Sequence, residues 1–142
     1  MDYMCNNENN TCENCIIDVL KVILILQQSV CNGDCCLENC ERGFLWQISN
    51  MFFNTRPVVI YTCGTGNEPL AMPISKDPNV TTTSTVCRLE KLDGCCATFR
   101  VLAPNTEEGS VFPYEATNSF FTINLGCVCV LRCLEDTFVD CI

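Results

Sequence analysis

The amino-acid sequence contains no histidine, few basic residues and no long uninterrupted apolar run. Without histidine the chain cannot form the usual Ser–His or Cys–His pair that activates a nucleophile. Phosphate-loop and dinucleotide-binding glycine motifs are also missing. We therefore expect no catalytic residues and no enzymatic activity.

The basic residues number 8 against 17 acidic residues, which gives a formal net charge of -9. This sign disfavours contact with phosphate backbones, so we expect no nucleic acid as a partner. The most apolar stretch, residues 16–26, is about half the ~20 residues that a spanning helix needs, and it includes Asp18 and Lys21. The first residues lack the basic and apolar regions of a secretory signal. We expect neither a membrane partner nor a signal peptide.

Cysteine is abundant, with 15 in 142 residues. This frequency is typical of disulfide scaffolds, thiolate metal clusters and cross-linked assembly units. An odd number of thiols cannot pair completely within one molecule. The length and the hydrophobic content of 48% are sufficient for a core that folds without disulfide staples. The cysteines are therefore additional to the core, which favours a cross-linking role.

One helix is predicted over residues 15–30, with Thr11 as its cap. Its polar positions form one narrow stripe, and isoleucine, valine and leucine fill the rest of its circumference. Two interpretations remain open: the helix is covered by its own domain, or it packs partly against a neighbouring subunit. A turn region with four cysteines follows at residues 31–43.

Several β-rich segments follow the turn region. Residues 57–63 predict a strand, 70–75 a short edge strand, 83–102 a hairpin, 104–117 a loop, and 119–134 a last strand or strand pair. The fold class that we predict is mainly β: an antiparallel β-sandwich-like domain preceded by one N-terminal α-helix and a Cys-rich turn region. Residues 1–50 would form an N-terminal arm and 51–142 the β-domain, although one continuous domain fits the pattern too.

The register of the predicted hairpin depends on its loop. A three-residue loop at residues 92–94 sets Leu89 opposite Ala97 and produces a mostly apolar face, whereas a two-residue loop mixes charge into that face. We therefore predict the three-residue loop. Cys95 then points inward and Cys96 points outward, since consecutive strand residues face opposite sides.

The cysteines divide into two sets by their place in the sequence. Those that a neighbouring molecule can reach are our candidates for intermolecular disulfides: Cys5, Cys12, Cys15, Cys31, Cys35, Cys36, Cys40, Cys96 and Cys141. Those on or beside predicted strands are candidates for structural or core positions: Cys63, Cys87, Cys95, Cys127, Cys129 and Cys133.

Metal binding is the alternative function. Cys12-x-x-Cys15 has a zinc-like spacing that Cys36 and Cys40 could complete. No second Cys-x-x-Cys follows, however, and no histidine is available. We predict no metal site and no cofactor, with a thiolate zinc-binding protein as the competing hypothesis.

Three segments carry a family resemblance. They are residues 54–62 (Asn-Thr-Arg-Pro-Val-Val-Ile-Tyr-Thr), residues 88–98 around Cys95-Cys96, and residues 123–134, which contain Cys127-x-Cys129-x-x-x-Cys133. In these segments the chain resembles the spore coat protein Z family, which includes the coat and exosporium proteins CotY, CotZ and ExsY. Cys95, Cys96, Cys127, Cys129 and Cys133 match cysteines of that family. The chain departs from the family at Cys87, where an aromatic residue is expected, and at Phe120, where a cysteine is common.

The resemblance implies a structural protein of the endospore surface, in the exosporium or outermost coat. Such a protein is made in the mother-cell cytosol without a signal peptide. It self-assembles into a two-dimensional lattice, with itself as partner in hexameric units and with other spore-surface proteins. Disulfides then cross-link the lattice.

Overall fold

The computed structural model describes residues 14–29, 53–64 and 66–142 of the chain. These residues form one α-helix and seven strands: α1 (Cys15–Gln28), β1 (Val58–Thr62), β2 (Met72–Pro73), β3 (Thr83–Ser84), β4 (Val86–Asp93), β5 (Cys96–Pro104), β6 (Tyr114–Asn124) and β7 (Val128–Cys133). A short 3-10 helix, Leu125–Cys127, connects β6 to β7.

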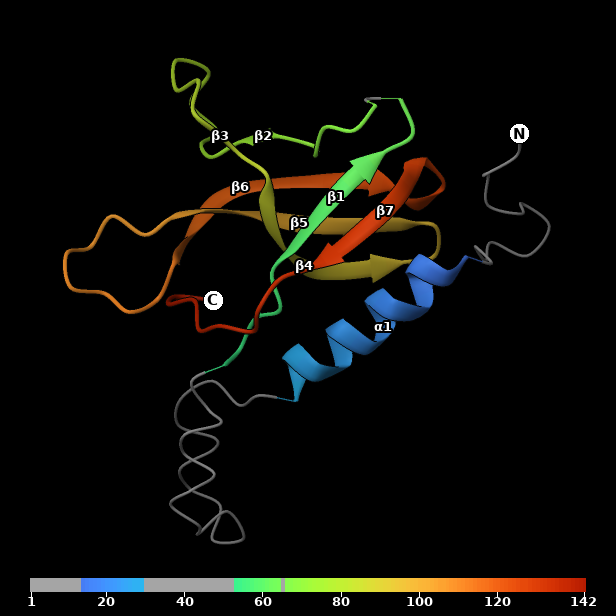
Figure 1. The fold of residues 1–142 in the computed structure, drawn as a ribbon, viewed down its shortest axis with the longest axis horizontal. Helices are drawn as coiled ribbons and strands as arrows, with labels where there is room; N and C mark the ends of the chain where they lie inside the picture. The colour runs from blue at the N-terminus through green and yellow to red at the C-terminus, as the bar shows by residue number, and fades with distance from the viewer. Residues whose placement is uncertain (1–13, 30–52, 65) are drawn as a thin grey trace, which may run out of the picture.

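Five of the strands form one antiparallel sheet in the order β6-β5-β4-β1-β7, and β2 pairs with β3 in a separate small sheet (Figure 1). Helix α1 crosses one face of the large sheet, where it packs against β4 and β7. The predicted class, mainly β with one leading helix, is confirmed. Among the described residues, no helix is long and apolar enough to cross a membrane.

The core lies between α1 and the sheet. Ile17, Leu20 and Ile23 of α1 are at most 3% exposed. They belong to one cluster with apolar residues of the sheet and of the β6–β7 connection: Val58, Ile60, Cys87, Leu89, Ala97, Phe99, Leu125 and Val128. The helix and the sheet therefore share one hydrophobic core, and burial of this apolar surface holds them together.

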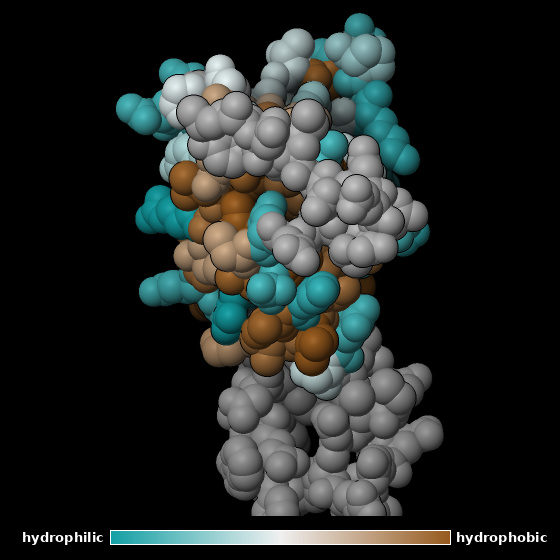
Figure 2. Space-filling model, turned by 90° about the vertical axis from the view of Figure 1, so that its right-hand side faces the viewer, coloured by the Kyte–Doolittle hydropathy of each residue, from teal (hydrophilic) through white to brown (hydrophobic). Residues whose placement is uncertain are grey.

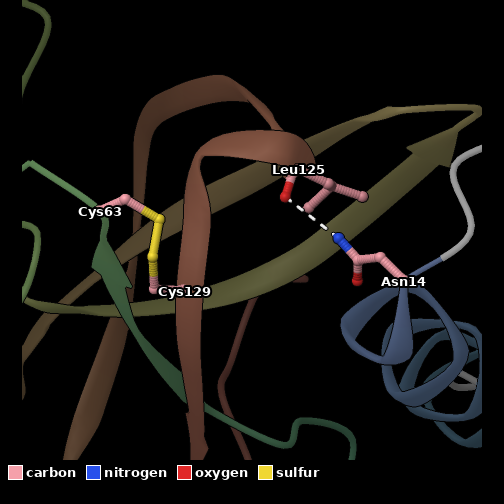
Figure 3. The surroundings of a disulfide bond; sticks show 4 residues. All are labelled: Asn14, Cys63, Leu125 and Cys129. Carbon is pink, nitrogen blue, oxygen red and sulfur yellow. Dashed lines mark hydrogen bonds between the residues drawn. A yellow bond between two sulfur atoms is a disulfide. The ribbon is translucent and has the colours of Figure 1, made fainter. Parts of the chain in front are cut away.

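Asn14 begins α1. Its side-chain oxygen accepts hydrogen bonds from the backbone N–H groups of Ile16 at 2.7 Å and Ile17 at 3.2 Å. Its amide nitrogen donates to the carbonyl oxygen of Leu125 at 3.3 Å (Figure 3). The cap is thus Asn14 and not the predicted Thr11. Because the same side chain bonds to the β6–β7 connection, it caps the helix and also fixes its end to the sheet.

Replacing Asn14 by alanine is expected to lower the free energy of unfolding by about 1–2 kcal/mol, as the loss of a helix cap does. Asn14→Asp is the matched control, because aspartate keeps the acceptor oxygen and loses only the donor to Leu125. Denaturant unfolding should show a smaller loss for Asn14→Asp than for Asn14→Ala. Equal losses would mean that capping is not the main role of this side chain.

The predicted register of the β4–β5 hairpin is wrong. Leu89 pairs with Phe99 and Leu92 with Ala97, so the hairpin turns through the two residues Gly94 and Cys95. Gly94 has φ 58, which suits the first central residue of a type II′ turn. The pairing shifts by one residue between Leu89 and Lys91, so Glu90 forms a β-bulge. The bulge lets both leucines face the core, which an unbroken strand would prevent.

The last predicted segment is a strand pair. The 3-10 helix at Leu125–Cys127 interrupts it, and the backbone N–H of Gly126 donates to the side chain of Asn124 at 2.9 Å. The predicted loop at residues 104–117 is too long, since β6 begins at Tyr114 and pairs there with Pro104 of β5.

Candidate functional site

The described cysteines are either disulfide-bonded or free thiols. Cys63 and Cys129 form a disulfide, and Cys95 is also disulfide-bonded. Six cysteines are free thiols: Cys15, Cys87, Cys96, Cys127, Cys133 and Cys141. Only Cys87 among these six is buried. The remaining candidates for intermolecular disulfides, Cys5, Cys12, Cys31, Cys35, Cys36 and Cys40, lie outside the described residues.

The Cys63–Cys129 disulfide joins two neighbouring strands (Figure 3). Cys63 directly follows β1 and Cys129 lies in β7, with 5.4 Å between their Cα atoms. The two residues are 66 positions apart in the sequence. Their pairing depends on β1 lying next to β7, and no local sequence pattern indicates this neighbourhood.

Three exposed thiols lie at one end of the sheet, which we call the thiol end: Cys15, Cys96 and Cys127. Cys15 is the first residue of α1, Cys96 begins β5, and Cys127 ends the 3-10 helix. Hydrogen bonds hold these elements together. The Leu125 carbonyl accepts from Asn14, and the Leu125 N–H donates to the Cys95 carbonyl at 2.8 Å.

Two further exposed thiols, Cys133 and Cys141, lie toward the opposite end, which we call the C-terminal end. Cys133 is the last residue of β7 and pairs with Val58, the first residue of β1. Because β1 and β7 are antiparallel, this pair and the Thr62–Val128 pair mark the two ends of the ladder.

Cys141 lies in the C-terminal segment, which Asn54 anchors through two 2.9 Å hydrogen bonds to the backbone of Val139. It borders a hollow of about 610 Å³ between this segment and the β5–β6 loop. The free, exposed thiols are thus divided between two ends of one folded domain.

Cys87 differs from the other free thiols. It is 4% exposed within the core, and its sulfur donates to the Val58 carbonyl at 3.6 Å. Burial raises the pKa of this thiol to about 12. Since the thiolate is the reactive form, Cys87 is protected from oxidation by both exclusion of solvent and lack of ionisation.

Alkylation of the native protein with iodoacetamide near pH 8 is expected to modify Cys133 and to leave Cys87 intact until the protein is unfolded. Mass spectrometry of the alkylated peptides measures this. Comparable labelling rates at the two residues would contradict a core position for Cys87.

The raised pKa of Cys87 also makes the stability of the protein depend on pH. Below pH 9.0 the thiol is neutral in both the folded and the unfolded protein and does not change the free energy of unfolding. As pH rises from there toward about 12, that free energy falls, because only the unfolded thiol ionises in this range.

The positions of the described cysteines follow the division predicted from the sequence only in part. Cys87 is buried in the core, whereas Cys127 and Cys133 are exposed, so these two residues do not occupy core positions. Cys95 was expected at an inward-facing strand position but lies in the hairpin turn. It is disulfide-bonded. Both cysteines of the Cys63–Cys129 disulfide were candidates for structural positions, but their partnership was not predicted.

No cluster of three or more cysteine, aspartate or glutamate side chains suited to a metal ion occurs within residues 14–29, 53–64 and 66–142. The competing zinc hypothesis rests on Cys12, Cys15, Cys36 and Cys40, of which only Cys15 belongs to these ranges.

Exposed thiols on a stable domain can form disulfides with other molecules once an oxidant is present.

Comparison with known proteins gives a family. Residues 3–112 match the family described as Spore coat protein Z. Neither the curated proteins nor the solved structures gave a match. The matched residues include α1 and the strands from β1 to β5 and end before the Cys127-x-Cys129-x-x-x-Cys133 segment. Membership of this family indicates a structural, non-enzymatic role at the spore surface. Since the match covers most of the sequence, the chain belongs to the spore coat protein Z family.

Proposed function

We propose that this protein is a building block of the outermost spore layers that self-assembles into a two-dimensional lattice locked by intermolecular disulfides. The family supports the location, and the exposed thiols at both ends of the domain support the cross-linking. We further propose the exosporium or outer coat as its location, hexameric units as the repeat of the sheet, and other surface proteins as neighbours.

The division of the thiols between two ends is the observation that carries this proposal. A domain with a single reactive thiol would stop at a cross-linked pair, because one bond consumes that thiol, and thiols gathered at one end would all face the same neighbourhood. Cys15, Cys96 and Cys127 at the thiol end and Cys133 and Cys141 at the C-terminal end let each copy bond to more than one neighbour. Connection at separate ends is the requirement for an extended assembly.

Each cross-link is a two-electron oxidation. Two cysteine thiols lose two protons and two electrons and form one S–S bond, and a small-molecule disulfide accepts the electrons to become two thiols. In a reducing cytosol the chain stays reduced, so assembly by non-covalent contacts precedes the covalent step. The buried Cys87 takes no part.

Electron microscopy of the purified, oxidised, full-length protein tests the proposal. We expect ordered sheets, and on a non-reducing gel a ladder of oligomers that collapses to monomer with reductant. A protein that stays monomeric after oxidation and loses its fold when a chelator removes zinc would contradict the proposal and support the thiolate metal site instead.

A further inference from the structure

Helix α1 presents apolar side chains on two sides. One side, with Ile17, Leu20 and Ile23, is buried against the sheet. On the other side Val19 is 43% exposed, Val22 54% and Leu26 44%, next to Ile25 at 65%. Figure 2 views the side of the molecule where α1 begins and shows hydrophobic residues gathered there between hydrophilic margins.

The exposed side of the helix ends in a thiol. Cys15, Val19, Val22 and Leu26 follow one another at intervals of four, three and four residues. This heptad spacing puts them on one narrow stripe along the helix, which we call the outer stripe, and such stripes pack against a second helix. Cys15 is an exposed, free thiol at the N-terminal end of this stripe.

The size of the outer stripe limits its occupant. A helix of 14 residues is about 21 Å long, and a stripe about 10 Å wide offers roughly 200 Å². Stable interfaces bury about 800 Å² per partner. The stripe therefore provides alignment but too little area to hold a partner by itself. A disulfide at Cys15 would supply the stability that this small contact area cannot give to a pair of helices.

We propose that the outer stripe pairs with the outer stripe of a second copy of this chain, with the two α1 helices parallel and a disulfide between the two Cys15 residues. A parallel, two-fold symmetric pair brings each stripe residue to its own counterpart, so the two Cys15 thiols meet. An antiparallel pair would set Cys15 beside Leu26 and Ser29 of the other copy, where no thiol is available. This pairing rests on the proposed function and names one of its contacts.

The bond forms by two exchange steps that balance. One Cys15 thiolate attacks a small-molecule disulfide, such as oxidised glutathione, and releases one small thiol. The second Cys15 thiolate then attacks the mixed disulfide at the sulfur of the first Cys15 and releases the other small thiol. The two protons leave the cysteines and end on the two released thiols.

The test uses full-length protein oxidised with glutathione disulfide and digested, without reduction, by a protease that cleaves after glutamate and aspartate. Cleavage at Glu13 and Asp18 releases residues 14–18, in which Cys15 is the one cysteine. This peptide is the same in the wild type and in both variants, so mass spectrometry can quantify the form in which two Cys15 residues are joined. We expect this peptide from the wild type and a loss of at least tenfold in Val22→Glu. Gln28→Glu is the matched control: it adds the same charge at an exposed position off the stripe and should behave as wild type.

Two results would overturn the pairing while leaving the proposed function intact. In the first, Cys15 stays a thiol or bonds only to other cysteines although intermolecular disulfides form elsewhere. In the second, Val22→Glu and Gln28→Glu yield equal amounts of the joined peptide. A complete absence of intermolecular disulfides in the oxidised protein would overturn both.

Discussion

Replacing Glu90 by alanine is expected to lower the free energy of unfolding by about 3–5 kcal/mol, the cost of leaving a buried ion partner unpaired. Arg88 and Arg100 are direct cross-strand partners in β4 and β5. Like charges in that position repel each other. Glu90, the bulge residue, accepts from Arg88 through one carboxylate oxygen and from Arg100 through the other, both at 2.9 Å.

The surroundings of Arg88 make this loss large. Its side chain is 9% exposed, and its remaining donors reach the hydroxyl of Thr55 at 2.9 Å and the carbonyl of Asn54 at 3.1 Å. Without Glu90, the guanidinium would keep its charge in a place that water hardly reaches. The Glu90 carboxylate thus offsets the repulsion between the two arginine charges. As the extra residue of the bulge, Glu90 also keeps Leu89 and Leu92 on the core face.

The Arg56–Asp136 pair provides the control. Its geometry is similar, with a 2.7 Å contact, but its side chains are 33% and 41% exposed. Asp136→Ala should therefore cost less than about 1 kcal/mol. Denaturant unfolding of the two alanine variants measures the difference. If Glu90→Ala costs no more than Asp136→Ala, the carboxylate at the bulge is not what holds the two arginines together.

The second large effect is expected for the Cys63–Cys129 disulfide. Replacing both residues by alanine should destabilise the oxidised protein by about 2–4 kcal/mol, because the cross-link restricts a long loop of the unfolded chain. β7 is an edge strand that pairs only with β1 within the large sheet. The disulfide fixes this edge at the thiol end of the domain.

A double replacement elsewhere on the same edge isolates the disulfide. Cys127→Ala with Cys133→Ala removes two exposed free thiols that flank Cys129, and its effect on unfolding should stay within about 0.5 kcal/mol. Reduction of the wild type should cost at least as much as the Cys63, Cys129 variant loses, because a reductant also opens the disulfide of Cys95. A wild type equally stable with and without reductant would contradict a stabilising role for this bond.

Local patterns in the sequence predicted the elements that depend on local chemistry. The apolar circumference of residues 15–30 identified α1, whose end at Gln28 lies two residues before the predicted one. Val22 and Leu26 are exposed, so the described part of the domain leaves this side of the helix uncovered, and its packing against a neighbouring subunit stays a prediction. The β-branched segment at residues 57–63 identified β1.

Features that depend on distant residues could not be predicted in this way. The predicted register failed because the turn lies at Gly94 and Cys95 and because Glu90 forms a bulge. The Glu90 carboxylate contacts Arg88 of its own strand and Arg100 across the hairpin. The partnership of Cys63 and Cys129 follows from the sheet order, which places the last strand beside the first. The surface positions of Cys127 and Cys133 follow from the 3-10 helix and from the end of β7 at the sheet edge.

The proposed function requires that thiols at both ends of the domain join copies of the chain, and isotope mixing distinguishes such bonds from bonds within one molecule. Equal amounts of ¹⁵N-labelled and unlabelled full-length protein are mixed, oxidised and digested without reduction, and disulfide-linked peptides of mixed label identify bonds between molecules. We predict mixed-label disulfides from Cys15, Cys96 or Cys127 at the thiol end and from Cys133 or Cys141 at the C-terminal end, and none from Cys87. Disulfides of a single label only, or mixed-label disulfides confined to one end, would contradict the claim.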